Sequence, residues 1–282
     1  MKFSKINNQV RILILYVRLT FLSFFYFGLI CEGVNKSNNP TIKVTPNVWG
    51  GAKIENIQKV LESTAKQFTP YIWQKNLKPI HVSRSRTGPI VLYRRGPNGE
   101  YLVRLSAQKT FWTQYAFQFA HEFGHIICGY KKGDQSNNWF EESICETASL
   151  YALINMTKDW KQKPPYQNWK SYANVFAKYA NERIKKNPWP KNISVANWYR
   201  KHKNSLEKNP ANRERNVKLA SKFLPLFTQN PQGWGSCAFM NKKQSDNKRS
   251  FKKYLFDWRD SCQSSAQKKF VTQFITGFGF NK

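Results

Sequence analysis

The sequence predicts an α+β fold, in which a small antiparallel sheet is followed by a mostly helical C-terminal lobe. Two observations predict this class. Short runs rich in Ile, Val, Leu and Tyr, separated by turn residues, follow one another over residues 79–105, and apolar residues recur at helical spacing on both sides of that stretch. The apolar content of 40% is that of a globular chain, despite a formal net charge of +30.

The N-terminal residues 1–33 have the pattern of an export signal. Basic residues precede an apolar run, Leu19 to Ile30, that is short for a membrane span. An uncleaved membrane anchor is the alternative, and membrane contact is expected only through this segment. In either case the rest of the chain is expected to be extracytoplasmic: secreted, periplasmic or anchored with the folded part outside. Residues 34–48 are polar and are predicted to form a linker.

Residues 49–160 combine helical and strand patterns. A helix is predicted over Lys53–Phe68, where the apolar residues recur with the period of a helix. Strands are predicted at Pro79–Ser83, Pro89–Arg94 and Glu100–Leu105, and the sequence Gly96-Pro97-Asn98-Gly99 reads as a hairpin turn between the last two. Two more helices are predicted, over Gln108–Tyr130 and Phe140–Met156.

Residues 161–282 are predicted to form the helical C-terminal lobe, and no internal repeat is visible in them. The expected helices are Trp169–Lys185, Val195–Leu206, Arg213–Phe227 and Phe251–Phe274.

The excess of 46 Lys and Arg over 16 Asp and Glu would favour an anionic partner, such as an acidic surface polymer. The basic residues are spread along the whole chain, however, without a dense block or a nucleic-acid motif. Nucleic acid is therefore not an expected partner, and the charge is expected mainly to solvate exposed faces.

The sequence His121-Glu122-Phe123-Gly124-His125 has the form HExxH, within a predicted buried helix. Residues four apart lie on one face of a helix, so both imidazoles can bind one zinc ion. Glu122 is displaced toward the water site, where it can accept and later deliver a proton. The alternative is that both histidines are hydrogen-bonded core residues, but burying them without partners would be costly.

A catalytic zinc site usually has a third protein ligand and keeps its fourth position for water. The metzincin pattern fails, because Cys128 and Lys131 stand where it has Gly and His. Downstream, Trp139-Phe140-Glu141-Glu142-Ser143 is similar to the Trp-Leu-Asn-Glu-Gly of aminopeptidase relatives. Glu142 to Glu146 is also similar to the Glu-x-x-x-Asp of thermolysin. The chain therefore resembles the gluzincins over about Phe111 to Leu153.

This resemblance implies that Glu142 is the third zinc ligand, with Glu141 as the rival. It also implies that Glu146 is the outer carboxylate that holds a ligand histidine. The implied fold is zincin-like, with residues 49–160 as the catalytic core and the last strand, Glu100–Leu105, pairing with an extended substrate. The Gly-x-Met-Glu-Asn motif that binds a free N-terminus in aminopeptidases is absent, so an endopeptidase is expected.

Gluzincins draw a donor for the oxyanion from a His or Tyr in the C-terminal helical region. Tyr199 and His202 lie at a suitable distance along the chain, and the alternative is that both are ordinary residues of a basic helix. Cys128 and Cys145 each follow a ligand on one of the two site helices by about one turn. They would form either a disulfide, if the chain is exported, or small buried packing residues.

The expected function is zinc-dependent hydrolysis of a peptide or protein substrate. The alternative is an exported basic protein that binds zinc for a structural or recognition role without hydrolysis. Glu122 favours the enzyme, because a purely structural zinc site does not need that carboxylate.

Overall fold

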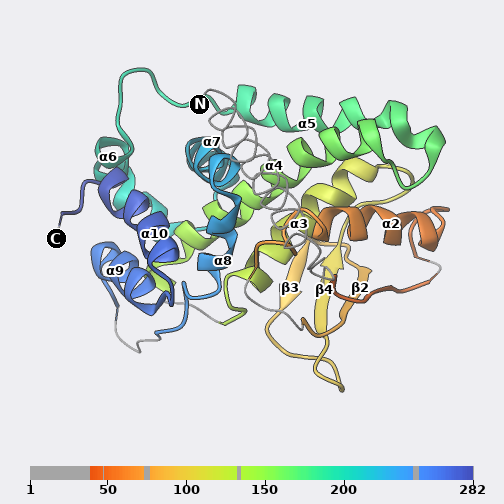
Figure 1. Cartoon of the computed structure of the whole chain (residues 1–282), viewed down its shortest axis with the longest axis horizontal. Helices are drawn as coiled ribbons and strands as arrows, with labels where there is room; N and C mark the ends of the chain where they lie inside the picture. The colour runs from red at the N-terminus through yellow and green to blue at the C-terminus, as the bar shows by residue number, and fades with distance from the viewer. Residues whose placement is uncertain (1–38, 47, 73–76, 132–134, 244–247, 282) are drawn as a thin grey trace, which may run out of the picture. The chain divides into compact units, whose positions relative to one another are not determined.

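The N-terminal half of the described chain builds a four-stranded sheet from β1 (Ile42–Val44), β2 (Ile80–Arg84), β3 (Ile90–Leu92) and β4 (Tyr101–Leu105). The computed structural model describes residues 39–46, 48–72, 77–131, 135–243 and 248–281 (Figure 1). The predicted export signal, residues 1–33, lies outside the described residues. Within the described ranges, no helix has both the length and the apolar character needed to cross a membrane.

The strand order is β1-β2-β4-β3, and the sheet is mixed. β1 is parallel to β2 and β2 is parallel to β4, whereas β3 and β4 are antiparallel. The prediction of an antiparallel sheet is therefore right only for the β3–β4 hairpin. In that hairpin the predicted turn is present, with Gly99 at a positive φ of 83° that suits glycine.

The sheet also contains a strand, β1, that the sequence pattern did not reveal. β1 lies within the predicted linker 34–48, and its first residue, Ile42, is buried. Parallel neighbours need a crossover connection, and α2 (Ile54–Ala65) supplies it between β1 and β2. The linker prediction was wrong at β1, because three strand residues between prolines give too short a pattern to recognise.

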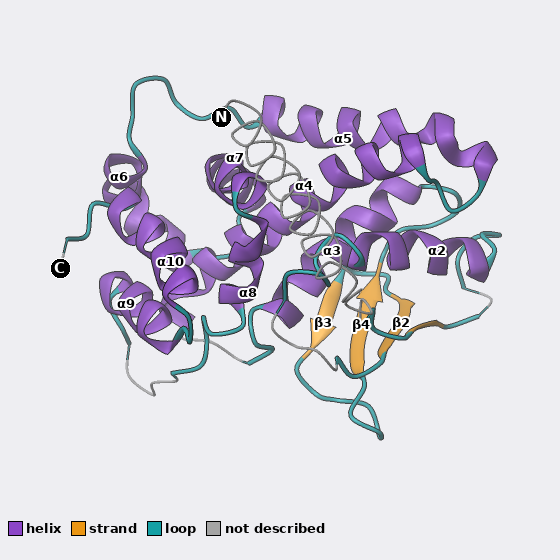
Figure 2. Ribbon diagram, in the orientation of Figure 1, coloured by secondary structure: helices purple, strands orange, loops and turns teal. Residues whose placement is uncertain are grey.

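Helix α3 (Trp112–Ile127) lies beside α2 and contacts β3 and β4 (Figure 2). It is buried along most of its length, as its apolar sequence predicted. Helix α4 (Asn138–Gln162) packs against α3 and also against α5 and α7 of the C-terminal half. The predicted boundary between residues 160 and 161 therefore falls inside α4, and the chain from Asn38 onward forms one compact unit.

The C-terminal half is helical, as predicted. Its α-helices are α5 (Ala173–Lys186), α6 (Val195–Lys208), α7 (Arg213–Gln229), the short α8 (Trp234–Cys237), α9 (Phe251–Ser261) and α10 (Ser265–Gly277). The single helix predicted over Phe251–Phe274 is two helices. The break has a local cause: Ser264 and Gln267 form a reciprocal capping box that begins α10.

Candidate metal centre

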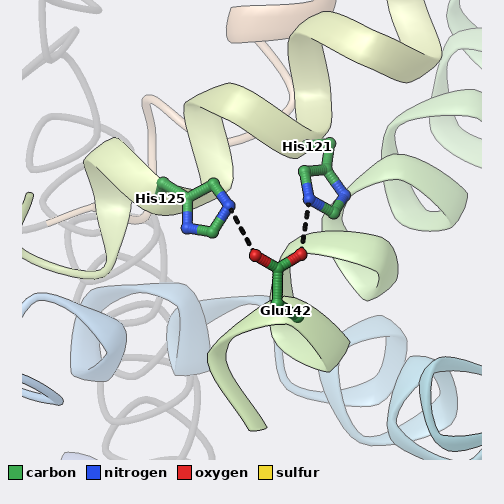
Figure 3. A group of neighbouring side chains, drawn as sticks. All are labelled: His121, His125 and Glu142. Carbon is green, nitrogen blue, oxygen red and sulfur yellow. Dashed lines mark hydrogen bonds and ion pairs between the residues drawn. The ribbon is translucent and has the colours of Figure 1, made fainter. Parts of the chain in front are cut away.

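Helix α3 holds His121 and His125 on one face, and both rings point at Glu142 of α4 (Figure 3). The Nε2 atom of His121 lies 3.2 Å from Oε2 of Glu142, and the Nε2 atom of His125 lies 3.6 Å from Oε1 of the same carboxylate. The structure therefore brings together the three residues that the sequence predicted as metal ligands.

The donor atoms of His121, His125 and Glu142 all lie within 4.8 Å of one another, so the group could hold a metal ion. Two imidazole nitrogens and one carboxylate oxygen form a donor set that suits zinc and other transition-metal ions. Burial alone would raise the pKa of Glu142, but its hydrogen bond to His121 and the nearby histidine charges lower it to about 2. Glu142 is thus anionic and ready to bind a cation.

The other ring nitrogen of each histidine faces a second carboxylate. Nδ1 of His121 lies 3.6 Å from Oε2 of Glu146, and Nδ1 of His125 lies 2.7 Å from Oε1 of Glu141. These contacts fix the ring orientations and leave both Nε2 atoms facing Glu142. The placement of Glu146 agrees with its predicted role, whereas Glu141 lies on the Nδ1 side of His125 and not beside Glu142.

His125, Glu141 and Cys145 form a second group whose donor atoms approach within 4.8 Å. We favour the first group as the metal centre for two reasons. His121, His125 and Glu142 all line one cavity, which Glu141 and Cys145 do not line, and Glu141 is already hydrogen-bonded to His125 and Asn241.

The C-terminal half supports the Glu141 contact through a buried chain of hydrogen bonds. The side-chain amide of Asn241 donates to Oε2 of Glu141 over 2.6 Å, and the Tyr254 hydroxyl donates to Oδ1 of Asn241 over 3.0 Å. Sequence reasoning missed both residues, because they lie more than 100 positions after His125 and outside any motif.

Burial also opposes protonation of the histidines, but their carboxylate partners outweigh it. The hydrogen bonds to Glu142 and Glu146 raise the pKa of His121 well above its usual value, and Glu141 and Glu142 raise that of His125 to about 9. Together with Glu122, four carboxylates surround two imidazoles. The carboxylates around the two rings favour a bound cation, which would take the place of the protons on the rings.

Comparison of this chain with known protein families, curated proteins and solved structures finds no match. Its function therefore has to be inferred from the side chains of the site itself.

Glu122 is buried, with 4% of its surface exposed, and it lines the same cavity as the three ligand candidates. Burial raises the pKa of Glu122, while His121 and His125 act in the opposite direction, as does a hydrogen bond from the backbone N–H of Val91 in β3. A carboxylate with a raised pKa beside a metal group suits proton transfer near neutral pH.

The cavity has a volume of about 590 Å³. Its walls come from the β2–β3 loop, α3, α4, α5 and the start of α7, and they include Arg86, Gln118, Tyr179, Arg183 and Arg213. Arg183 donates to Oε1 of Glu146 over 3.1 Å and lies over the Phe117 ring, 4.1 Å from its centroid. A separate cavity of about 500 Å³, beside Gly235 and Phe270, contains none of these side chains.

Tyr199 and His202, the predicted oxyanion donors, do not line the cavity that holds the metal group. The Tyr199 ring is buried against Trp139, with the centroids 5.6 Å apart and the planes nearly parallel. His202 stacks on Trp198 with 4.3 Å between the ring centroids, and its Nδ1 lies 2.8 Å from the Trp198 carbonyl oxygen. The physical reason is aromatic packing, which buries Tyr199 against Trp139 and holds the half-buried His202 against Trp198.

The four described cysteines, Cys128, Cys145, Cys237 and Cys262, are free and buried. This corresponds to the packing alternative rather than to a Cys128–Cys145 disulfide. Gly124 explains how tightly this region packs, because a Cβ atom at this position would lie 3.0 Å from Cα of Cys145. The glycine of the HExxH motif thus permits the close approach of α3 and α4.

Proposed function

We propose that this chain is a zinc-dependent endopeptidase with a zincin-like fold. The observation that carries the proposal is the position of Glu122. Its carboxylate shares a cavity with His121, His125 and Glu142, yet it is not one of the three converging donors. A purely structural metal site has no use for an additional carboxylate in an open cavity.

A zinc ion held by His121, His125 and Glu142 would act as a Lewis acid toward the scissile carbonyl and make a nearby water more acidic. Glu122 would accept the proton of that water and deliver it to the leaving amine. Glu146 and Glu141 would hold the two imidazoles in the orientation that directs Nε2 at the ion.

The strand that would pair with an extended substrate is β3 and not β4. β4 has neighbours on both sides, β2 and β3, so its backbone groups are already used. β3 is at the edge of the sheet, its residue Ile90 lines the cavity and is 46% exposed, and Val91 contacts Glu122. A peptide added to this edge would run past the metal group.

A donor for the developing oxyanion would come from the α5 wall, where Tyr179 and Arg183 line the cavity. Tyr179→Phe would lower kcat for peptide hydrolysis while leaving the zinc content unchanged, if its hydroxyl has this role. Unchanged kcat in that variant would assign the role to another group.

The decisive experiment compares the zinc-loaded wild-type chain with Glu122→Gln on a broad peptide library, with cleavage followed by mass spectrometry. Glu122→Gln keeps the size of the side chain and loses its basicity. We expect zinc content to stay near one ion per chain and hydrolysis to fall by about a hundredfold or more. Glu142→Ala, by contrast, should lose zinc.

Equal hydrolysis by wild type and Glu122→Gln would show that Glu122 is not the base. Zinc binding by wild type without cleavage of any peptide would favour the alternative, a basic zinc-binding protein without hydrolysis.

We also propose that the chain is exported. The motivation is the basic and then apolar N-terminal sequence, residues 1–33. Mass spectrometry of the chain recovered from its native cell should find an N-terminus near residue 34. An intact N-terminus on protein from the cytosolic fraction would contradict export.

A further inference from the structure

The charges that line the metal-site cavity do not cancel once a divalent ion is present. Three arginines line it, Arg86, Arg183 and Arg213, together with three glutamates, Glu122, Glu142 and Glu146. With the histidines neutral, as metal ligation requires, the side chains sum to 3 − 3 = 0. A divalent ion then leaves the cavity with a surplus of two positive charges.

The two surplus positive charges can be assigned to Arg86 and Arg213, because each of the other positive charges is matched by a glutamate. Arg183 is neutralised by Glu146, at 3.1 Å, and its guanidinium is held over Phe117. The two charges of the ion are matched by Glu142 and Glu122. Arg86 and Arg213 remain, and neither forms an ion pair with a carboxylate of the described residues.

Arg86 and Arg213 reach the cavity from different walls. Arg86 belongs to the loop between β2 and β3, immediately before the exposed edge strand. Arg213 is the first residue of α7, and its charge interacts with Glu142. Both are exposed, so each guanidinium can meet a ligand without breaking an existing ion pair.

Most basic residues of the chain are expected only to solvate exposed faces, whereas Arg86 and Arg213 line the cavity of the metal group. A cavity lined by unbalanced charge of one sign concentrates the potential and attracts a ligand of the opposite sign. The planar guanidinium also matches a carboxylate with two parallel hydrogen bonds.

We propose that this cavity selects peptides that carry a carboxylate close to the scissile bond, and that Arg213 and Arg86 bind it. This inference rests on the proposed peptidase function. The carboxylate has two possible sources, an acidic side chain within the peptide or the free C-terminus of a short one.

The first test uses the zinc-loaded full chain and three sets of heptapeptides, random except at one fixed position. One set is N-acetylated and C-amidated with Glu at that position, and the second is identical with Gln. The third has Gln and a free C-terminal carboxylate. We expect kcat/KM for the Glu set, or for the free-acid set, to exceed that for the amidated Gln set by about tenfold. The set that is preferred identifies the source.

Arg213→Gln and Arg86→Gln should reduce this preference, because they should raise KM for the carboxylate-bearing peptides by a larger factor than KM for the amidated Gln set. Arg200→Gln is the matched control, because Arg200 is an exposed arginine of α6 that does not line the cavity. It should keep the full preference. Equal loss of preference in all three variants would mean that the net charge of the chain is responsible and would overturn the assignment.

A binding measurement makes the inference testable without catalysis. Zinc-loaded Glu122→Gln is equilibrated with each peptide set, and the bound peptides are quantified by mass spectrometry. A carboxylate-bearing set should be retained about tenfold better than the amidated Gln set. This difference in retention between the carboxylate-bearing and the amidated Gln set should shrink in the Arg213→Gln/Glu122→Gln double variant. It should also shrink when the salt concentration is raised about tenfold, from about 0.05 M to about 0.5 M.

The two proposals fail in different ways. Cleavage and binding of all three sets without preference would overturn the carboxylate selection and leave the peptidase intact. Preferential binding of a carboxylate-bearing set by a wild-type chain that cleaves nothing would support the selection and refute the peptidase.

Discussion

The Nδ1 atom of His125 lies 2.7 Å from Oε1 of Glu141, and this contact ties the HExxH helix to the residue just before the third ligand candidate. Glu141 therefore orients His125, while its neighbour Glu142 faces both Nε2 atoms. Adjacent residues of α4 point in different directions around the helix, so one helix supplies both a ligand candidate and the support for another ligand candidate.

Glu141→Ala should lower metal affinity by about ten- to a hundredfold, because His125 would lose the carboxylate that fixes its ring. Asn241→Leu should have a smaller effect in the same direction, since it removes the amide that donates to Glu141. Competition with a chromophoric zinc chelator measures both affinities. Glu55→Ala, an exposed acid in the first turn of α2, is the control and should bind metal like wild type. Wild-type affinity in Glu141→Ala would show that Glu141 does not support the site.

Removal of the metal should destabilise the chain, because an ion that binds only the folded state adds to its stability. At free metal 100-fold above Kd this contribution is about 2.7 kcal/mol. Thermal unfolding with zinc and with chelator should therefore give clearly different Tm values for wild type, and one common Tm for His121→Ala.

His202→Ala is the matched control for that experiment. His202 stacks on Trp198 and does not line the cavity, so this variant should keep both the zinc and the difference in Tm. Loss of zinc in His202→Ala would contradict the placement of the site, as would full retention of zinc by His121→Ala.

The sequence predicted the metal group because its information is local. His121 and His125 are one helical turn apart, and Glu142 and Glu146 are again one turn apart on the next helix, so helical geometry alone places each pair on one face. Their joint orientation then needs only the packing of α3 against α4.

Features that depend on distant contacts were not predictable in this way. Asn241 reaches Glu141 across 100 positions of sequence, and β1 becomes a strand only because β2 pairs with it. Tyr199 and His202 have the right residue types for catalysis, but Trp139 and Trp198 offer them aromatic contacts away from the cavity. Residue type and chain position do not show whether such a side chain lies in the cavity or packs against aromatic rings elsewhere.

Asp257 should make stability depend on acid pH. Burial would raise its pKa, but the partners Lys253, Lys243 and Arg249 outweigh burial and lower it. A carboxyl with a folded pKa below its unfolded value of about 3.9 adds stability that is complete well above that pH and is lost as the pH falls through the folded pKa. Asp257→Asn should therefore cost about 2 kcal/mol of unfolding free energy at pH 7 and less at pH 3, which lies below the unfolded pKa.

Urea unfolding at the two pH values measures this difference. The control is Asp260→Asn, whose side chain is 49% exposed and pairs only with the adjacent Arg259 among the described residues, so the expected change is below about 0.5 kcal/mol at either pH. An Asp257→Asn cost that is equal at pH 7 and pH 3 would mean that the ion pairs do not contribute through their charge.

Gly124→Ala tests whether the close approach of α3 and α4 positions the metal group. The new methyl group would lie 3.0 Å from Cα and 3.1 Å from Sγ of Cys145, closer than ordinary contact, so the two helices must separate by a few tenths of an ångström. Because His125 and Glu142 lie on these two helices, the separation should weaken metal binding as well as destabilise the fold by about 1 to 3 kcal/mol.

The matched control is Gly277→Ala at the end of α10, where an added Cβ meets nothing within 4 Å. That change should be neutral or stabilise by up to about 1 kcal/mol, with metal affinity unchanged. Urea unfolding of the metal-free chain separates the cost to the fold from the cost to the site. A Gly124→Ala chain that is less stable yet binds zinc with wild-type affinity would show that the helix spacing supports the core but does not set the geometry of the ligands.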